Sequence, residues 1–282
     1  MSVASSAAVD ADRGLTAAEF GWIQRFLRER TGIELKPGKE ALVMGRLDRR
    51  LRHHGLTSYT EYFQLLGAGG DADETRMATD LLTTNETYFF REPAHFSFLR
   101  EWAARRGRAS GSVRVWSAAS STGEEAYSIA MTLADSLPAQ QHREIVGTDI
   151  STRVLETARR GMYPIDAAAK IPKNLLQEYC LRGRDEYDGF LAVGTELRSQ
   201  VRFEQANLLD LPASLGQFDL IFLRNVMIYF ELDTKRDLIA QVEHMIRPGG
   251  HLIISHSETL SGIRTGLTLV TPSIYRLGDD GE

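Results

Sequence analysis

The chain has 282 residues, of which 43% are hydrophobic, and it carries a formal net charge of −5 with a pI near 5.9. This length favours two domains, because single cores tend to stop growing beyond about 250 residues. The acidic balance argues against general nucleic-acid binding, which requires a basic field. No apolar run reaches bilayer length, and the first residues lack the features of a signal peptide. We expect a cytoplasmic protein without nucleic-acid partner or membrane insertion.

Disulfide and metal chemistry find no support in the composition. Cys180 is the only cysteine, which excludes a disulfide framework and a metal cluster held by cysteines. The sequence therefore predicts a protein of a reducing compartment, with no metal site.

Four helical patterns and no strand pattern occupy the first eighty or so residues. Residues 1–14 are small and polar, and we expect a disordered lead-in there. Thr16 and Glu19 match a capping box that opens a helix ending near Gly32. Further helices are expected at residues 39–54, 58–66 and 73–82. Residues 15–82 are thus predicted to form an all-helical N-terminal domain.

The second of these helices carries a set of cations on one face. Its members recur at helical spacing and are Arg46, Arg49, Arg50 and His53. A solvated surface explains such a face as readily as recognition of an acidic partner does. Both readings stay open at this point.

Residues 83–92 lie where the helical patterns end and form the expected interdomain linker. The linker contains three consecutive aromatic residues, Tyr88 to Phe90, which a simple linker would not expose to solvent. They either plug the domain interface or line a ligand pocket there. In the second case Asn85, Thr87 and Arg91 would supply polar contacts to a ligand.

From Val113 onward, strand patterns alternate with helical ones, which predicts an α/β domain over residues 93–282. The first strand is followed by a loop of small residues that ends at Gly123, and then by a helix that opens with Glu124 and Glu125. The loop lacks the glycines of a dinucleotide site, and the carboxylates would repel a pyrophosphate. They would favour a ligand with a ribose and a cationic sulfonium, such as S-adenosylmethionine. The alternative is that both glutamates only complement the helix dipole.

The ends of the later strands carry polar residues. Residues 144–149 end in Asp149, roughly one βαβ unit downstream of the loop, where nucleotide-binding folds place an acid on a ribose. Two further strand patterns end in the pairs Asn207–Leu208 and Arg224–Asn225. Because ligands bind at the carboxyl ends of strands in open α/β sheets, these residues are candidates for the same site.

The remaining patterns complete the sheet. Residues from about 162 to 200 are irregular, with short strand patterns, and predict a small inserted β subdomain. A helix at residues 233–246 and strands at 251–255 and 273–277 follow. The predicted fold class is α/β, a doubly wound Rossmann-like class I methyltransferase sheet with a helical N-terminal domain.

Five blocks of the sequence, in order, resemble those of the CheR family, the glutamate methyltransferases of chemotaxis receptors. The blocks are Thr84–Arg91, Trp116–Glu125, Thr148–Ile150, Arg224–Phe230 and His256–Glu258. Each block alone is weak, and five in register are specific. The resemblance covers about residues 16 to 277, including the insertion.

The resemblance implies which residues contact S-adenosylmethionine. These are Asn85, Thr87, Arg91, Glu124, Asp149, Asn207, Leu208, Arg224 and Asn225. Whether Glu124 or Glu125 faces the cofactor stays open. No catalytic residue is assigned, because a glutamate substrate is already ionised at neutral pH. Tyr229, His256 and Glu258 are candidate orienting groups, although His256 can equally be read as a core histidine.

The resemblance also implies a reaction and partners. The methyl group would pass to glutamate carboxylates on acidic cytoplasmic helices of methyl-accepting chemotaxis receptors, leaving S-adenosylhomocysteine. The cationic face of Arg46, Arg49, Arg50 and His53 would recognise those helices, and the inserted subdomain could dock a receptor tail peptide. We expect a monomer. The alternatives are a methyltransferase for another protein or a small molecule, and a non-catalytic adaptor with the same fold.

Overall fold

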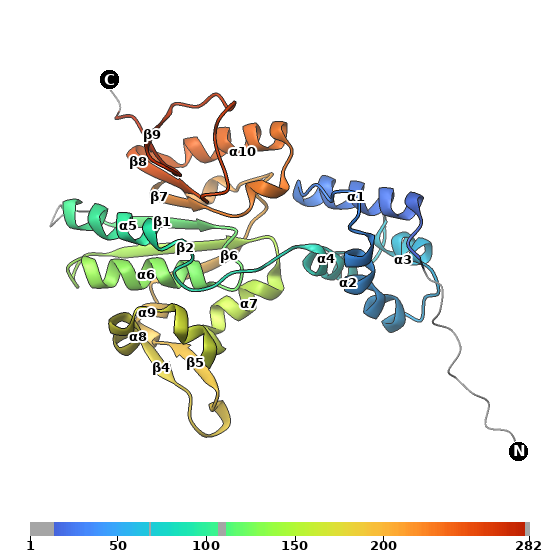
Figure 1. Ribbon diagram of the computed structural model, residues 1–282, viewed down its shortest axis with the longest axis horizontal. Coiled ribbons are helices and arrows are strands. Elements are labelled where there is room, and N and C mark those ends of the chain that lie inside the picture. Colours follow the sequence, from blue (N-terminus) through green and yellow to red (C-terminus); the bar gives the residue numbers. More distant parts are fainter. Residues whose placement is uncertain (1–13, 68, 107–110, 280–282) are drawn as a thin grey trace, which may run out of the picture. The chain divides into compact units, whose positions relative to one another are not determined.

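The computed structural model describes residues 14–67, 69–106 and 111–279, so the expected lead-in lies outside the described residues except for Gly14. The chain divides into two compact units, Met1–Thr83 and Thr84–Glu282 (Figure 1). None of the helices in the described ranges is long and apolar enough to cross a membrane.

The first unit is all-helical. It contains α1 (Ala17–Thr31), α2 (Glu40–His53), α3 (Tyr59–Leu66) and α4 (Ala72–Leu82). The predicted capping box is confirmed, because Thr16 accepts a hydrogen bond from the Glu19 amide while the Glu19 carboxylate caps the Thr16 amide. The apolar faces of the helices form one core, in which Trp22 stacks on Phe63 with ring centroids 4.4 Å apart.

A buried carboxylate joins the helices of this unit. Glu74 on α4 is 3% exposed and accepts hydrogen bonds from Arg50 of α2 and from the Tyr62 hydroxyl of α3. His54 lies 2.8 Å from the same carboxylate. Burial raises the pKa of Glu74, but the hydrogen bonds from these three partners outweigh burial and lower the pKa to about 2.

This lowered pKa predicts an acid-sensitive first unit. Because the folded-state pKa lies below the ordinary value of 4.5, the stability contributed by Glu74 is present above that value and is lost as the pH falls toward 2. We expect urea unfolding, followed by circular dichroism, to show a smaller loss of stability between about pH 5 and about pH 3 in Glu74→Gln than in the wild type. Glu29→Gln, an exposed change on α1, is the control. An equally steep pH dependence in Glu74→Gln would contradict this role.

A seven-stranded sheet forms the centre of the second unit. Its strands lie in the order β6-β2-β1-β7-β8-β10-β9. Their bounds are β1 (Val113–Ala118), β2 (Arg143–Asp149), β6 (Val201–Gln205), β7 (Phe218–Leu223), β8 (Ile246–Ile254), β9 (Leu267–Thr271) and β10 (Ile274–Leu277). The first five strands in this order are parallel, and the last two pair antiparallel. This sheet confirms the predicted class I methyltransferase fold.

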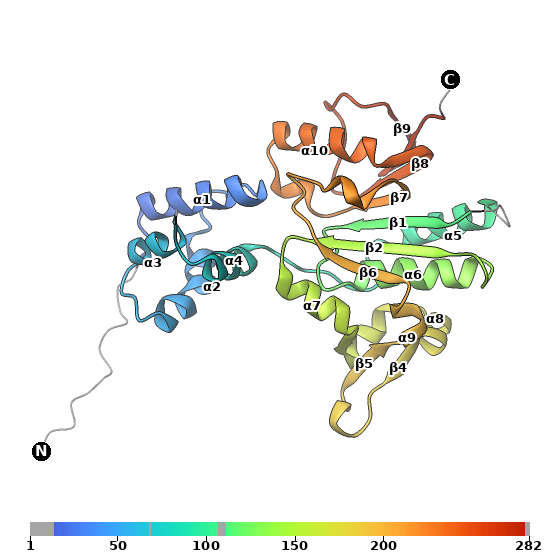
Figure 2. The ribbon, with the colours of Figure 1, turned by 180° about the vertical axis from the view of Figure 1, so that it is seen from behind.

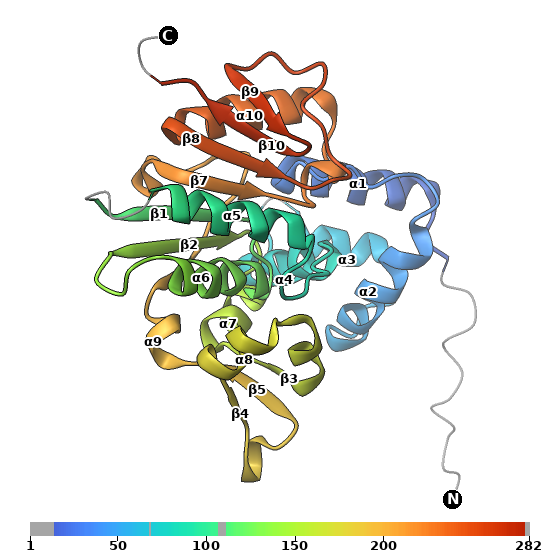
Figure 3. The ribbon, with the colours of Figure 1, turned by 60° about the vertical axis from the view of Figure 1, so that its left-hand side comes forward.

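Helices cover both faces of the sheet. α5 (Pro93–Arg106) and α6 (Glu124–Ser136) lie side by side on one face, and α10 (Leu232–His244) covers the other (Figures 2 and 3). Alternate residues such as Leu220 and Phe222 of β7 point into the core beneath α5 and α6. A further helix, α7 (Thr152–Arg160), follows β2. α5 was not predicted from the sequence, because its apolar residues are spread around the helix rather than gathered on one face.

Residues 162–198 form the predicted inserted subdomain. A small antiparallel sheet contains β3 (Met162–Pro164), β5 (Phe190–Val193) and β4 (Cys180–Arg182), in that order. Two short helices, α8 (Lys173–Tyr179) and α9 (Thr195–Arg198), accompany it. The subdomain also contains two short 3-10 helices, η1 (Ile165–Lys170) and η2 (Asp185–Tyr187). Two more lie outside it, η3 (Ala213–Leu215) before β7 and η4 (Met227–Tyr229) after β7.

Candidate functional site

The candidate site lies at the carboxyl ends of the parallel strands, which together form the carboxyl edge of the sheet. Positive φ angles are rare for residues other than glycine, and they cluster where a structure holds strain for a purpose. Five such residues lie in the segment before α5, in the loop after β1 and at the end of β7. They are Phe90 (55°), Glu92 (58°), Ala119 (59°), Ser121 (50°) and Asn225 (57°).

Asp149, the last residue of β2, organises this edge. The side chain is buried, with 7% of its surface exposed. Its Oδ2 atom accepts the backbone N–H of Ser121 at 2.9 Å, and Oδ1 accepts that of Ser151 at 3.0 Å. Asp149 thus holds the loop after β1 and the start of α7. Because a carboxylate accepts several hydrogen bonds at once, this geometry is compatible with the predicted contact to a ribose.

Gly123 determines the close packing of the loop on α7. It is the N-cap of α6 and has a φ of 97°, which favours glycine. A Cβ at this position would lie 2.8 Å from the Cβ of Ala158. Any larger residue would therefore push the loop away from α7 and away from Asp149.

The two glutamates after the loop have different surroundings. Glu125 accepts hydrogen bonds from Ser117 at 2.7 Å and from Arg224 at 2.9 Å, so its charge is neutralised within the protein. Glu124 accepts a hydrogen bond from the Thr122 hydroxyl at 2.6 Å. Burial raises the pKa of Glu124, and the hydrogen bond from Thr122 opposes this shift only in part. Of the two, Glu125 is committed to Arg224, so Glu124 remains our candidate for the cofactor contact.

The side chain of Arg224, an expected cofactor contact, is held by protein partners. Its side chain is 1% exposed and is surrounded by protein partners. It pairs with Glu125, lies 3.5 Å from Glu92, and donates a hydrogen bond to the carbonyl of Arg91. The Arg224 side chain therefore joins the end of β7 to α6 and to the segment before α5.

The three consecutive aromatic residues Tyr88 to Phe90, called here the aromatic strip, differ in burial. Phe89 and Phe90 are 1% and 7% exposed and belong to the core of the second unit, where they pack with the α5 and α6 cluster. Tyr88 is 41% exposed, and the guanidinium of Arg91 lies 5.7 Å from its ring centroid. Arg91 also donates a hydrogen bond to the Glu86 carbonyl. The strip anchors this segment to the sheet because two of its three rings fill the core.

Other predicted residues meet at or near this edge. The Asn85 carbonyl accepts a hydrogen bond from the Ser121 hydroxyl at 2.9 Å, which ties the segment before α5 to the loop after β1. Thr87 is half-buried in the same segment. Asn207 and Leu208 follow β6, and the Asn207 side chain accepts the Leu209 amide. The Asn225 amide group donates to Ser255 at 2.8 Å.

Glu258 shapes the loop that carries Tyr229. Its carboxylate accepts four backbone N–H groups, those of Asn225, Val226, Ile228 and Ser255, at 2.9 to 3.3 Å. Tyr229 is half-buried at the end of η4 in the same loop. Glu258 therefore fixes the backbone of the loop after β7.

His256 is not the core histidine of one sequence reading. Its side chain is 50% exposed, and its Nδ1 atom lies 3.1 Å from the hydroxyl of Ser273. Its neighbours Glu92, His95 and Ser273 were not predicted from the sequence as site residues. Glu92 directly follows Arg91, an expected cofactor contact, and this adjacency could have indicated that Glu92 lies near the site. His95 and Ser273 carried no such signal, because they lie 178 residues apart in the chain.

The four side chains of the expected cationic face on α2 have different surroundings. Arg50 pairs with the buried Glu74, and Arg46 donates hydrogen bonds to the carbonyls of Leu82 and Thr83 at the end of α4. These two arginines thus hold the first unit together. Arg49 and His53 are exposed. Only this exposed pair of the four predicted cations presents its side chains outward.

The fold and the edge together define a class I, S-adenosylmethionine-dependent methyltransferase domain. A buried acid ends β2, a glycine-capped helix follows β1, and carboxylates rather than cations open that helix, which suits a ribose and a sulfonium better than phosphates.

Comparison with known proteins identifies the family. The model of the "CheR methyltransferase, SAM binding domain" matches residues 85–275, and that of the "CheR methyltransferase, all-alpha domain" matches residues 18–83. The chain belongs to the CheR methyltransferase family, and its cofactor is S-adenosylmethionine.

Curated relatives are similar over nearly the whole chain. A chemotaxis protein methyltransferase of Escherichia coli is 41% identical over 94% of this chain and 93% of its own length. That of Salmonella typhimurium is 41% identical over 94% and 92%. Chemotaxis protein methyltransferase 2 of Pseudomonas aeruginosa is 42% identical over 86% and 87%.

Proposed function

We propose that this enzyme transfers the methyl group of S-adenosylmethionine to glutamate carboxylates of chemotaxis receptors, giving glutamyl methyl esters in sensory adaptation. Membership of the CheR family and the chemotaxis relatives support this assignment. The structural observation that supports the cofactor part of this assignment is the buried carboxylate of Asp149 at the end of β2. It holds the loop after β1 and the start of α7, and it would accept hydrogen bonds from a ribose. We also propose that the enzyme is cytoplasmic, because the acidic receptor segments that it would methylate lie in the cytoplasm. We further propose that it is a monomer.

The cofactor would be held by the segment before α5, the loop after β1 and the strand ends. The proposed contacts are Asn85, Thr87, Arg91, Glu124, Asp149, Asn207, Leu208 and Asn225. When bound, S-adenosylmethionine supplies an electrophilic methyl group on a sulfonium. Asp149 would orient the ribose while it holds the loop through Ser121. The Arg224 side chain would support these contacts indirectly, because it fixes the positions of Glu125 and of the Arg91 carbonyl.

The reaction needs no general base from the protein. A glutamate side chain has an ordinary pKa of about 4.3 and is ionised at neutral pH. Its attack on a sulfonium methyl neutralises both charges, so a water-poor site favours the transition state over the separately hydrated reactants. Catalysis therefore depends on alignment and desolvation. We propose Tyr229, which lies in the loop that Glu258 holds, as the group that orients the substrate.

The bond that forms provides a direct test. Receptor cytoplasmic fragments should acquire label from S-adenosylmethionine carrying a radioactive methyl group, and mild alkali should release that label as methanol, because esters hydrolyse under conditions in which N-methyl and ether bonds survive. A fragment whose acceptor glutamates are replaced by alanine is the control. Label that resists alkali, or transfer only to a small-molecule panel, would contradict the proposal.

We propose that the exposed part of α2 meets the acidic receptor helix. Arg49 and His53 lie one helical turn apart and are exposed, so they can approach carboxylates without abandoning internal partners. Arg46 and Arg50 support this surface indirectly by fixing α2 to α4. Exposed charge pairs contribute only about 0.2–1 kcal/mol each and weaken with salt. Recognition by this surface should therefore raise the rate of association with the receptor more than the affinity of the complex.

Charge reversal at Arg49 tests this surface. Arg49→Glu should raise the apparent KM for receptor fragments about 2- to 10-fold at low ionic strength, and the difference should shrink as salt is added. S-adenosylmethionine affinity, measured by calorimetry, should not change. Arg236→Glu, an exposed change on α10, is the matched control. A normal KM for Arg49→Glu at every ionic strength would leave α2 without a recognition role.

The inserted subdomain fits the second proposed contact, a receptor tail peptide. β4 is an edge strand of the small sheet, and the surface around it exposes large apolar side chains. Leu181, Tyr187 and Phe190 are 62%, 50% and 42% exposed. An edge strand beside apolar side chains can bind an extended peptide by strand addition.

A further inference from the structure

Two histidines and a glutamate converge at the N-terminal end of α5. Glu92 precedes the helix, His95 lies in its first turn, and His256 follows β8. One donor atom from each of the three side chains lies within 4.8 Å of the other two. Oε2 of Glu92 is 3.4 Å from Nδ1 of His95 and 3.9 Å from Nε2 of His256.

One hydroxyl orients both imidazole rings. The Ser273 hydroxyl lies 2.7 Å from Nε2 of His95 and 3.1 Å from Nδ1 of His256, and it donates its own proton to the Pro272 carbonyl. Ser273 can then only accept from the two rings, so each neutral ring carries its proton on the nitrogen that faces Ser273. The opposite nitrogens, which face Glu92, are left as acceptors.

Three acceptors therefore point toward one another. Nδ1 of His95 has no hydrogen-bond partner among the described residues, although the residue is fully buried. A buried acceptor that faces a carboxylate is unfavourable unless a positive species lies between them.

We propose that Glu92, His95 and His256 bind a divalent transition-metal ion, with Zn²⁺ as the preferred ion. Imidazole and carboxylate are its usual ligands, with bonds of about 2.0–2.2 Å that place neighbouring donors about 3.4 Å apart. The ring nitrogens held by Ser273 match the outer hydrogen bonds that fix histidine ligands. This site differs from the sequence-based prediction of no metal.

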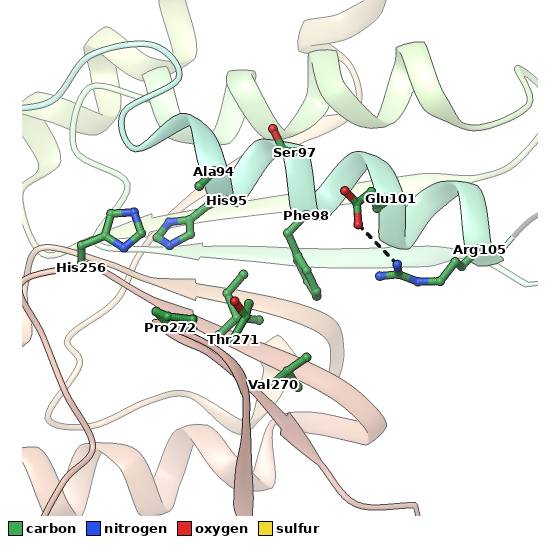
Figure 4. Close-up of a pocket in the computed structure, with 11 residues that line it drawn as sticks. Ala94, His95, Ser97, Phe98, Glu101, Arg105, His256, Val270, Thr271 and Pro272 are labelled. Atoms are coloured by element: carbon green, nitrogen blue, oxygen red, sulfur yellow. Dashed lines mark hydrogen bonds and ion pairs between the residues drawn. The ribbon is translucent and has the colours of Figure 1, made fainter.

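The surroundings allow entry and leave a position for solvent. Figure 4 shows the His95 and His256 rings next to each other at one end of a cleft of about 650 Å³ between α5 and the turn at Pro272. The His256 side chain is 50% exposed, so it can adjust as the ion binds. Arg224, 3.5 Å from Glu92, has Glu125 as a closer partner at 2.9 Å. It therefore retains a counter-charge when Glu92 binds the cation.

The site would link three segments of the second unit. These are the start of α5, the loop after β8 and the turn between β9 and β10. Glu92 also accepts hydrogen bonds from Ser255 and Asn225 at the carboxyl edge. The ion therefore acts as a clamp beside the cofactor site and takes no part in methyl transfer.

Calorimetry with zinc chloride alone tests the proposal on the full chain, with any affinity tag removed. The wild type should bind one equivalent of Zn²⁺ at neutral pH and unfold at a higher temperature in its presence, and Mg²⁺ should do neither. His256→Gln should abolish stoichiometric binding. Ser273→Gly, which keeps the positive φ of 65° available, should weaken binding about 10- to 100-fold. His142→Gln, an exposed histidine elsewhere, should bind like the wild type.

The variants decide between a metal and a shared proton. His256 is half exposed, so its replacement should leave the fold intact, which circular dichroism and thermal unfolding without added metal verify. Absence of stoichiometric Zn²⁺ binding by the wild type would mean that the three groups share a proton instead, and would overturn the proposal. Unchanged binding by His256→Gln, or loss of binding by His142→Gln, would place the ion elsewhere and would also overturn it.

Discussion

Replacing Arg224 by methionine should lower the free energy of unfolding of the second unit by about 3–5 kcal/mol, the largest effect that we expect from a single substitution. The side chain is 1% exposed, and in the metal-free protein its removal leaves the carboxylates of Glu125 and Glu92 without their main counter-charge. Methionine keeps much of the volume, so the loss measures the charge rather than a cavity. Urea unfolding at neutral pH is the measurement.

The matched control for this substitution is an exposed arginine in an ion pair. Arg236 pairs with Asp233 on α10, with side chains 49% and 89% exposed, and Arg236→Met should change stability by less than about 0.5 kcal/mol. Adding Glu125→Gln to Arg224→Met should restore part of the loss, because it removes one uncompensated charge. A cost below about 1 kcal/mol for Arg224→Met would show that the cluster is not a buried electrostatic anchor.

Asp149→Ala should weaken S-adenosylmethionine binding by about 1–3 kcal/mol, or roughly 5- to 150-fold. The variant loses the proposed ribose contact and also the two backbone hydrogen bonds that hold Ser121 and Ser151. Because both losses disturb the same loop, affinity should fall more than global stability. Calorimetry gives the affinity, and thermal unfolding in the absence of the cofactor separates the two effects.

Asp188→Ala, an exposed acid in the inserted subdomain, is the control for this measurement and should bind the cofactor normally. Unchanged affinity in Asp149→Ala would remove the ribose assignment. A fall in unfolding temperature that accounts for the whole loss of affinity would make Asp149 a loop anchor alone.

Local patterns predicted the backbone of this protein well where one segment determines its own structure. The capping box of Thr16 and Glu19 depends on residues three apart, and it formed as expected. The strand ending at Asp149 and the glycine before Glu124 depend on equally short patterns. α5 was missed, because its residues show little amphipathic periodicity and its position depends on packing against α6.

Side-chain roles were harder to predict, because partners come from distant segments. Arg50 and Arg46 looked like surface cations on α2. Instead, Arg50 forms an ion pair with Glu74, and Arg46 donates a hydrogen bond to the Leu82 carbonyl at the end of α4. Arg224 looked like a ligand at a strand end, and the glutamates at positions 92 and 125 enclose it. In each case the helical or strand pattern determined the backbone position but left the partner open.

The sequence by itself determined the class of this protein: the alternation of strands and helices predicts the sheet, and five family blocks in order predict the methyltransferase. These features are readable because hydrophobic period and loop chemistry act over a few residues. Only the tertiary structure decided which charges are neutralised inside the protein, and which point outward. It also brought Glu92, His95, His256 and Ser273 together from three segments. The physical reason is that burial and pairing are properties of a side chain's surroundings in space, which chain order does not specify.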